Sequence, residues 1–221
     1  MPRASLAAYR KQWPRIGGVL AMAVGGATTL AAKKMTKPQL LSAVNFGAVL
    51  VHQYEEYVDP GWFPGQFNKG LFRSDSPRNY PLNTNTALCV NTAFAYPFYI
   101  APVLFPKNMW LGLGPVLFGI SQAFTHGVVF PLQAGDKYSP GFLASILLHV
   151  PIGTTYLRAV RAGGGLTRGD WVRGILYTLT FAAVGVAGPN IVGSDKNSPY
   201  AFEPRQMGRY DTAPATDLVI E

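Results

Sequence analysis

Charged side chains are scarce in this sequence. Asp, Glu, Lys and Arg together make up 14% of its 221 residues, whereas about 25% is usual in soluble domains. The charges gather in short clusters, and long runs without charge separate these clusters. This layout argues against an ordinary soluble domain and is typical of a multi-pass membrane protein, in which the spans are apolar and the loops carry the charge.

Acidic residues are the scarcer charged class: 11 acids face 19 lysines and arginines, which leaves a net charge of +8. The basic residues flank the apolar runs, as in Arg10, Lys11 and Arg15, then Lys33, Lys34 and Lys37, then Arg158, Arg161 and Arg168. Anionic lipid head groups and the positive-inside bias explain this pattern. We therefore expect the lipid bilayer as the partner of these residues, and no nucleic acid.

Cysteine occurs once, as Cys89, and histidine three times, as His52, His126 and His149. A single cysteine excludes an intrachain disulfide and a zinc site built on cysteines. A metal site in this chain would therefore draw on imidazoles and carboxylates.

Six apolar runs are present, at residues 16–32, about 38–57, 86–106, 109–130, 140–157 and 171–190. Within lipid, such segments form helices or closed barrels, and these runs are too long and too uniformly apolar for barrel strands. We expect an all-α, multi-pass transmembrane helical bundle with five or six spans. The first run is short and could be a signal peptide, but we favour a retained helix because the next run also resembles a span.

Local signals mark where some of these helices begin or bend. Ser139 followed by Pro140 predicts a helix start with a serine N-cap, and Asp170 before Trp171 predicts a second cap. Pro97 and Pro102 predict a kink in the third run.

Three regions follow from these patterns. Residues 1–35 form a basic segment and the first apolar helix, 36–190 the membrane bundle, and 191–221 a polar extramembrane tail that we expect to be partly disordered. One long loop, 59–85, is rich in aromatic and turn-forming residues. We expect this loop to pack over the bundle or at the membrane interface, where it could form a lid over the end of the second helix.

The sequence HQYEE, residues 52–56, ends the second apolar run. On a helix, Glu55 and Glu56 lie about 60° and 40° to either side of His52, so all three share one face. Asn45 lies on the same stripe, and Tyr54 points away. Ionisable groups within a membrane segment are costly and usually mark a functional site.

Further polar residues lie at matching depths on other predicted helices. If consecutive helices alternate in direction, His52, Asn91 and His126 share a layer about 8 Å below one membrane boundary, and His149 lies about 6 Å deeper. We therefore expect these side chains to meet inside the bundle, although a hydrogen-bonded packing role is the ordinary explanation for any one of them.

Imidazole and carboxylate together suit a transition metal, with zinc or iron as the expected ion. We expect His52, Glu55, Glu56, His126 and His149 as candidate ligands, and His52, Glu55, Glu56 and Asn91 as candidate catalytic residues. A metal-free alternative is open, because adjacent carboxylates repel and one of them could act as an acid beside an ionised partner.

The sequence resembles the HXXEE domain family. The resemblance rests on HQYEEY at 52–57, VNTAF at 90–94 and QAFTHGVVFPLQAGDKYSPGF at 122–142, and it covers roughly residues 40–160. It implies an integral membrane protein in which His52, Glu55 and Glu56 are the motif residues and Asn91 and His126 are partner positions. It also implies an enzymatic or metal-binding role, without a defined reaction.

The leading hypothesis is a membrane enzyme that acts on a lipophilic small molecule, which enters from the bilayer or under the 59–85 loop. Hydrolysis, isomerisation or cyclisation needs only a Lewis acid and a base, whereas oxidation is less expected because no haem or flavin motif is present. The alternatives are a metal-free Glu/His isomerase or cyclase, a proton-coupled transporter, and a metal-binding membrane protein without turnover.

Overall fold

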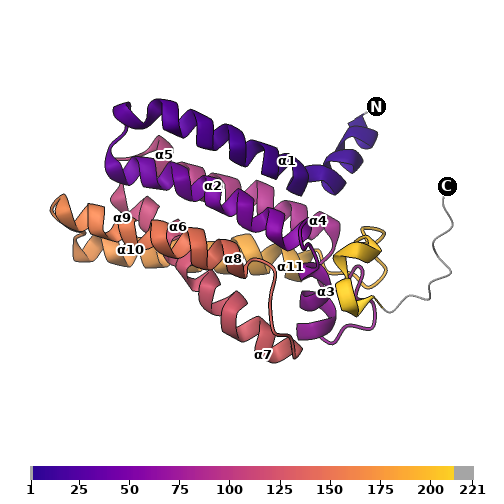
Figure 1. Ribbon diagram of the computed structural model, residues 1–221. Coiled ribbons are helices and arrows are strands. Elements are labelled where there is room, and N and C mark those ends of the chain that lie inside the picture. Colours follow the sequence, from indigo (N-terminus) through magenta and orange to yellow (C-terminus); the bar gives the residue numbers. More distant parts are fainter. Residues whose placement is uncertain (1, 212–221) are drawn as a thin grey trace.

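The computed structural model describes residues 2–211, and all regular structure within them is helical, as expected for an all-α protein. Six long helical rods make up the bundle, and four of the rods are interrupted by a π-helical segment (Figure 1). In chain order the α-helices are α1 (Pro2–Ala31), α2 (Lys37–Tyr57), α3 (Phe63–Gly65), α4 (Thr84–Leu88), α5 (Ala95–Leu104), α6 (Met109–Phe124), α7 (Phe130–Ala134), α8 (Phe142–Ala144), α9 (Val150–Ala162), α10 (Arg168–Thr180) and α11 (Gly188–Val192).

Five helical rods of the described chain are long and apolar enough to cross a membrane. They cover Leu6–Lys34, Thr84–Leu104, Met109–Ala134, Phe142–Ala162 and Arg168–Val192. Large apolar side chains stand exposed along them, for example Met22, Leu132 and Leu176, as expected for surfaces that face lipid. These are the helices of an integral membrane protein, and the prediction of a multi-pass bundle is confirmed.

Helix α2 is the sixth rod and lies at the centre of the bundle. It is long enough to span, with 21 residues, but its last turns carry His52, Gln53, Glu55 and Glu56 and are not apolar. Most of its residues from Ser42 onward are buried by other helices. One apolar stripe of α2, with Val44, Val51 and Tyr54, stays exposed, whereas the polar residues of its last turns are buried against neighbouring helices.

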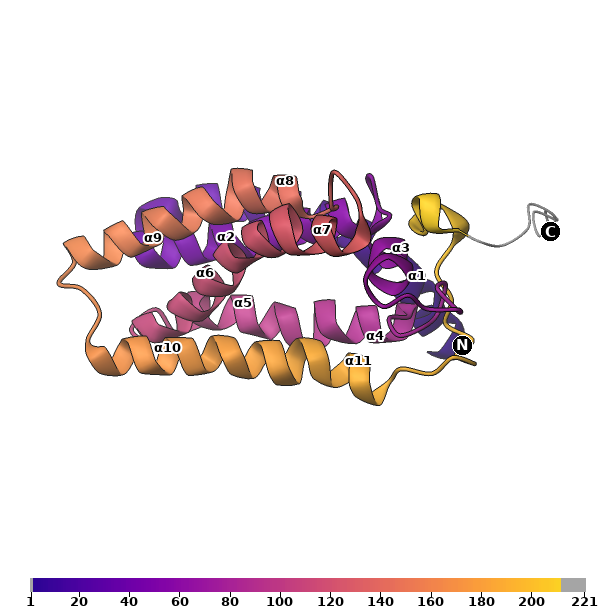
Figure 2. The same ribbon diagram turned by 90° about the horizontal axis from the view of Figure 1, so that it is seen from below.

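Consecutive rods alternate in direction, as the depth comparison assumed. The N-terminal end of α1, helix α3, helix α11 and the last described residues all lie at one end of the bundle (Figures 1 and 2). The short turns at 32–36, 105–108 and 163–167 lie at the other end. The C-terminal end of α2, which carries the HQYEE residues, is therefore at the same end as the 58–83 connection.

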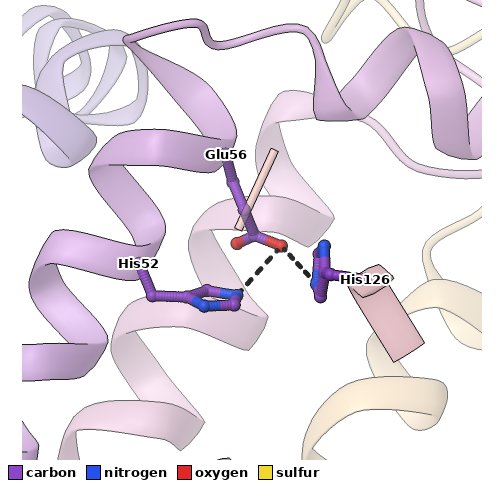
Figure 3. A group of neighbouring side chains, drawn as sticks. All are labelled: His52, Glu56 and His126. Carbon is purple, nitrogen blue, oxygen red and sulfur yellow. Dashed lines mark ion pairs between the residues drawn. The ribbon is translucent and has the colours of Figure 1, made fainter. Parts of the chain in front are cut away.

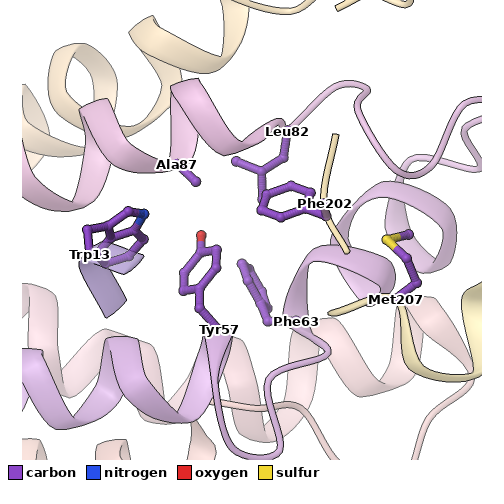
Figure 4. Close-up of a cluster of buried hydrophobic side chains, with 7 residues drawn as sticks. All are labelled: Trp13, Tyr57, Phe63, Leu82, Ala87, Phe202 and Met207. Carbon is purple, nitrogen blue, oxygen red and sulfur yellow. The ribbon is translucent and has the colours of Figure 1, made fainter. Parts of the chain in front are cut away.

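An aromatic cap closes that end of the bundle. Its buried cluster contains Trp13, Tyr57, Phe63, Leu82, Ala87, Phe202 and Met207 (Figure 4). These residues come from α1, α2, α4, the 58–83 connection and the tail. The presence of Phe63 and Leu82 in the cluster confirms that the loop packs over the bundle. The loop is more ordered than expected, since it contains α3 and a π-helical segment, Gln66–Leu71.

The described part of the tail, residues 193–211, is anchored to the bundle by a few side chains. Phe202 and Met207 are 4% and 0% exposed, because both fill the aromatic cap. Arg78 holds the tail further through a two-pronged ion pair with Asp211. The remaining tail, 212–221, lies outside the described residues.

Each interrupted rod has a proline just after its π-helical segment. The segments are Cys89–Phe94, Thr125–Val129, Ser145–His149 and Phe181–Ala187, and the prolines are Pro97, Pro131, Pro151 and Pro189. Proline lacks an N–H and clashes with the carbonyl one turn earlier, so the preceding turn widens. A kink was expected in the third run alone, whereas the interruption recurs in four rods.

The two predicted N-caps are wrong in detail. Helix α8 begins after Gly141, not Ser139, and has no local side-chain cap. Helix α10 begins after Thr167, whose hydroxyl forms a capping box with Asp170 at the third helical position. Asp170 does take part in the cap, as expected, but it lies three residues after the N-cap residue, Thr167.

Candidate functional site

Three side chains from two rods converge beneath the aromatic cap. Oε1 of Glu56 lies 3.5 Å from Nε2 of His52 and 3.5 Å from Nε2 of His126 (Figure 3). The three atoms all lie within 4.8 Å of one another, and each residue is buried. The prediction that His52 and His126 meet is therefore confirmed in the structure.

Local helix geometry places these residues. His52 and Glu56 are four apart on α2, so they lie one turn apart on the same face. His126 lies in the π-helical segment Thr125–Val129, between α6 and α7. Such segments are rare and frequently occur at functional sites. His149 and Asn91 also lie in π-helical segments.

A serine fixes the orientation of each of the two imidazoles. Oγ of Ser139 lies 3.0 Å from Nδ1 of His126 and donates its proton to Gln66. Oγ of Ser145 lies 3.2 Å from Nδ1 of His52 and donates to the carbonyl of Gly141. Because each hydroxyl proton is already used, each serine accepts from Nδ1–H of its histidine.

The consequence is an electron-rich centre. With Nδ1 protonated, Nε2 of His52 and Nε2 of His126 each direct a lone pair toward Glu56. Two lone pairs beside a carboxylate repel unless a positive charge lies between them, and a metal ion or a proton can supply it. Two ligand atoms on a tetrahedral zinc lie about 3.4 Å apart for bonds of about 2.1 Å. Both distances from Glu56 fit this spacing.

A hydrogen-bonded chain continues from His126 to the protein surface. Ser139 donates to Oε1 of Gln66, and Nε2 of Gln66 donates to Asp136 at 2.7 Å. Tyr210 and Arg209, both from the tail, also bind Asp136. Burial raises the pKa of Tyr210, and its hydrogen bond to Asp136 raises it further. Gln66 and Ser139 are fully buried, so the tail anchors a chain that orients a site histidine.

His149 lies beside the centre and not within it. Its ring centroid is 5.5 Å from that of His52, and its Nδ1 lies 2.9 Å from Oδ1 of Asn45. Asn45 is two turns before His52 on α2, which fits the greater depth predicted for His149. The structure thus places His149 as a neighbour of the three converging side chains.

Glu55 lies apart from the other site residues. Its carboxylate accepts hydrogen bonds from the backbone N–H groups of Leu143 and Ala144 and from the Tyr138 hydroxyl. Glu55 thus caps helix α8 from a different helix. Burial raises the pKa of Tyr138, and the bond to Glu55 raises it further, so its hydroxyl stays a donor. With both oxygens occupied, we assign Glu55 a structural role in place of the expected catalytic or ligand role.

Asn91 and the converging residues line one cavity of about 250 Å³. Among the described residues, no hydrogen bond joins the Asn91 side chain to the histidines or to Glu56: its amide donates to the carbonyl of Ala87 and, at 3.4 Å, to the Tyr57 hydroxyl. Apolar side chains make up most of the remaining wall, including Phe63, Phe118 and Phe181. The cavity therefore has a polar end at the centre and an apolar body.

Two glycines that the sequence did not single out allow the rings to approach. A Cβ on Gly141 would lie 2.8 Å from Cε1 of His126 and 2.9 Å from Cε1 of His52, and its φ of +103° also favours glycine. A Cβ on Gly119 would lie 2.7 Å from Nδ1 of His149. Gly141 follows Ser139 and Pro140, so the SPG sequence supplies both a hydrogen bond and space.

One family model matches the part of the chain that contains this centre. A family model described as "Protein of unknown function with HXXEE motif" matches residues 43–156, which is just over half of the chain. That range includes His52, Glu56, Asn91, His126 and His149. No curated protein and no solved structure matches the chain. By this match the chain belongs to the HXXEE family.

Proposed function

We propose that this protein is a multi-pass membrane enzyme that converts a lipophilic small molecule at a metal ion held by His52, Glu56 and His126. The observation that carries the proposal is the pair of Nε2 lone pairs that face one carboxylate oxygen, each at 3.5 Å. Two histidines and a carboxylate are the protein ligands of many catalytic zinc sites and of non-haem iron(II) sites. The expected ion is zinc or iron.

Side chains outside the ligand set support this assignment. Metal-binding histidines usually donate their second ring N–H to a protein acceptor, which fixes the ring and its basicity. Ser139 and Ser145 provide such acceptors here.

The reaction class that fits these residues is hydrolysis, isomerisation or cyclisation. A bound ion of this kind supplies a Lewis acid and lowers the pKa of a water ligand. Nε2 of His149 is buried beside the His52 ring and has no hydrogen-bond partner among the described residues. It can accept a proton from a substrate held at the polar end of the cavity.

The substrate enters from the bilayer in this proposal. The aromatic cap seals the end of the bundle under the 58–83 connection. By contrast, Gln122, Thr125 and Asn190 line the cavity and are only half-buried. They lie on the α6–α7 rod and on α11, whose ribbons diverge toward this end (Figure 2). An apolar molecule could pass between these rods without crossing the cap.

Metal analysis of the full chain purified in detergent tests the proposal. We expect about one zinc or iron per chain, lost on chelation and lost in His126→Ala. The matched control is His149→Ala, which removes a neighbouring imidazole outside the ligand set and retains the ion. A folded, metal-free protein that does not take up zinc or iron would overturn the metal assignment.

A second candidate is acid–base catalysis by Glu56 without metal. It is favoured by the position of one carboxylate oxygen between two imidazole nitrogens, since a proton there can be shared by all three groups. Turnover of an identified substrate that survives chelation, but is lost in Glu56→Gln, would support this candidate over the metal enzyme.

A further inference from the structure

Three buried hydrogen-bond acceptors in the cavity wall have no partner among the residues that the structure describes. They are Oε1 of Gln53, Nε2 of His149 and Oδ1 of Asn190. All three residues line the cavity that contains the His52–Glu56–His126 centre. Gln53 and His149 are each 1% exposed. Such atoms are costly to bury unpaired, so each one points to something that occupies the cavity.

The opposite end of each side chain fixes which of its atoms is left without a partner. Nε2 of Gln53 donates to the backbone carbonyl of Asn91 at 3.0 Å, and Nδ2 of Asn190 donates to that of Val186 at 2.9 Å. A carbonyl accepts only, so neither amide can be reversed. Nδ1 of His149 faces Oδ1 of Asn45 at 2.9 Å, which leaves Nε2 as a lone pair.

These acceptors come from separate elements. Gln53 lies on α2, His149 in the π-helical segment Ser145–His149, and Asn190 on α11. Packing of one helix pair does not explain orphaned acceptors on three walls of the same cavity. A molecule with hydrogen-bond donors on an apolar body complements both these atoms and the apolar lining.

We propose that the cavity binds a neutral, largely apolar molecule that carries at least two hydroxyl groups. Its hydroxyl protons are accepted by Gln53 and His149, with Asn190 receiving a donor near the half-buried edge. This inference rests on the proposed function, because a divalent ion beside the single carboxylate of Glu56 leaves a net positive charge. That charge favours a neutral alcohol over an ammonium group.

The test measures binding of matched probes to the full chain in detergent, by the shift of its thermal unfolding midpoint with probe concentration. The probes are phenylethanediol, its dimethyl ether, and the corresponding diamine. Each is measured on metal-loaded and on chelated protein. We expect the diol to raise the midpoint at concentrations at which the ether, which has no donor, has no effect.

Variants locate the bound hydroxyl groups. Gln53→Met and Asn190→Leu should each weaken diol binding at least tenfold, and neither should change the response to the ether. Thr125→Val is the control, since Thr125 lines the same cavity but its hydroxyl already donates to the carbonyl of Ser121. Asn190 lies at the half-buried edge, so its variant remains informative if Gln53→Met fails to fold.

The outcomes separate this inference from the metal proposal. Diol binding that persists in chelated protein supports the ligand class whether or not a metal is found. Preference for the diamine in either form would overturn the choice of a neutral ligand. Equal binding of diol and ether, or diol binding unchanged in both variants, would mean that water satisfies the three acceptors and would overturn the inference.

Discussion

Glu55 and Glu56 are neighbours in the chain, yet their carboxylates have different surroundings. Glu56 faces two imidazoles, whereas Glu55 caps α8 through two backbone N–H groups. Helix periodicity places both acids on the His52 face, so the sequence could not separate them. The partners of Glu55, Leu143 and Ala144, are about ninety residues away, and only the folded bundle brings them within reach.

The isosteric pair Glu56→Gln and Glu55→Gln tests this separation. We expect Glu56→Gln to lose the metal ion, while the unfolding free energy of the chelated protein stays nearly unchanged. Glu55→Gln should keep the ion and lose about 1–3 kcal/mol of unfolding free energy, because an amide replaces a charged acceptor of buried N–H groups. Metal content and thermal unfolding of the chelated proteins measure the two effects. Loss of metal in both variants would mean that Glu55 is also needed to hold the metal ion.

Ser139 orients His126, so its hydroxyl should affect metal affinity without touching the metal. We expect Ser139→Ala to weaken metal binding about 10–100-fold, the usual effect of losing such a partner. Ser42→Ala is the matched control, because Ser42 is also buried but bonds only the carbonyl of Pro38 on its own helix. Affinity is measured by competition with a chelator of known affinity. Equal losses in the two variants would indicate a general effect on stability.

At the scale of elements, π-helical segments carry the polar residues of three rods. Asn91, His126 and His149 each lie within one, and a proline follows each segment. The apolar runs were predictable, because length and hydropathy determine them, whereas their alternating directions were assumed. The widened turns were not predictable, since regular helical spacing was assumed within each rod. The sequence signal for the widened turns was the proline that follows each of them, at Pro97, Pro131 and Pro151.

Pro131 provides a test of the link between proline and π-helical segment. In Pro131→Ala, the restored N–H can bond to the carbonyl four residues earlier, which favours a regular α-helix. If the widened π-helical turn becomes an α-helical one, the turn holds one residue fewer. His126 is then rotated by about 100° relative to α7. We expect at least a tenfold loss of metal affinity.

The control for this change is Pro115→Ala, because Pro115 lies inside α6 with regular helix before it. Circular dichroism should show that both variants keep their helix content. Metal affinity equal to that of the unmodified protein in Pro131→Ala would mean that the π-helical segment does not depend on the proline.

Over the whole molecule, apolar side chains face outward from the bundle and the polar site residues face inward. The five rods that are apolar enough to span expose apolar side chains. Helix α2 exposes one apolar stripe but buries most of its residues, including His52, Glu55 and Glu56. Its hydropathy is lower because its buried side carries these polar residues. Composition along the chain cannot reveal this burial. The sequence left the choice between five and six spans open for another reason, namely the shortness of the first apolar run, 16–32.

We expect α2 to be a sixth crossing, which would place both ends of the described chain on one side of the membrane, together with the 58–83 connection. Single cysteines in a Cys89→Ala background test this in sealed vesicles with a membrane-impermeant maleimide. The four substitutions are Lys34→Cys and Asp75→Cys, which flank α2, and Asn108→Cys and Asn197→Cys. All four positions are exposed. We expect Lys34→Cys and Asn108→Cys to react from one side.

Asp75→Cys and Asn197→Cys should then react only from the opposite side, or only after the vesicles are opened. The comparison across α2 is the decisive one, because α2 is the rod whose hydropathy alone does not predict a span. If Lys34→Cys and Asp75→Cys react from the same side, α2 does not cross the membrane. The His52–Glu56–His126 centre would then lie at an interface, and substrate entry between α6–α7 and α11 would lose its support.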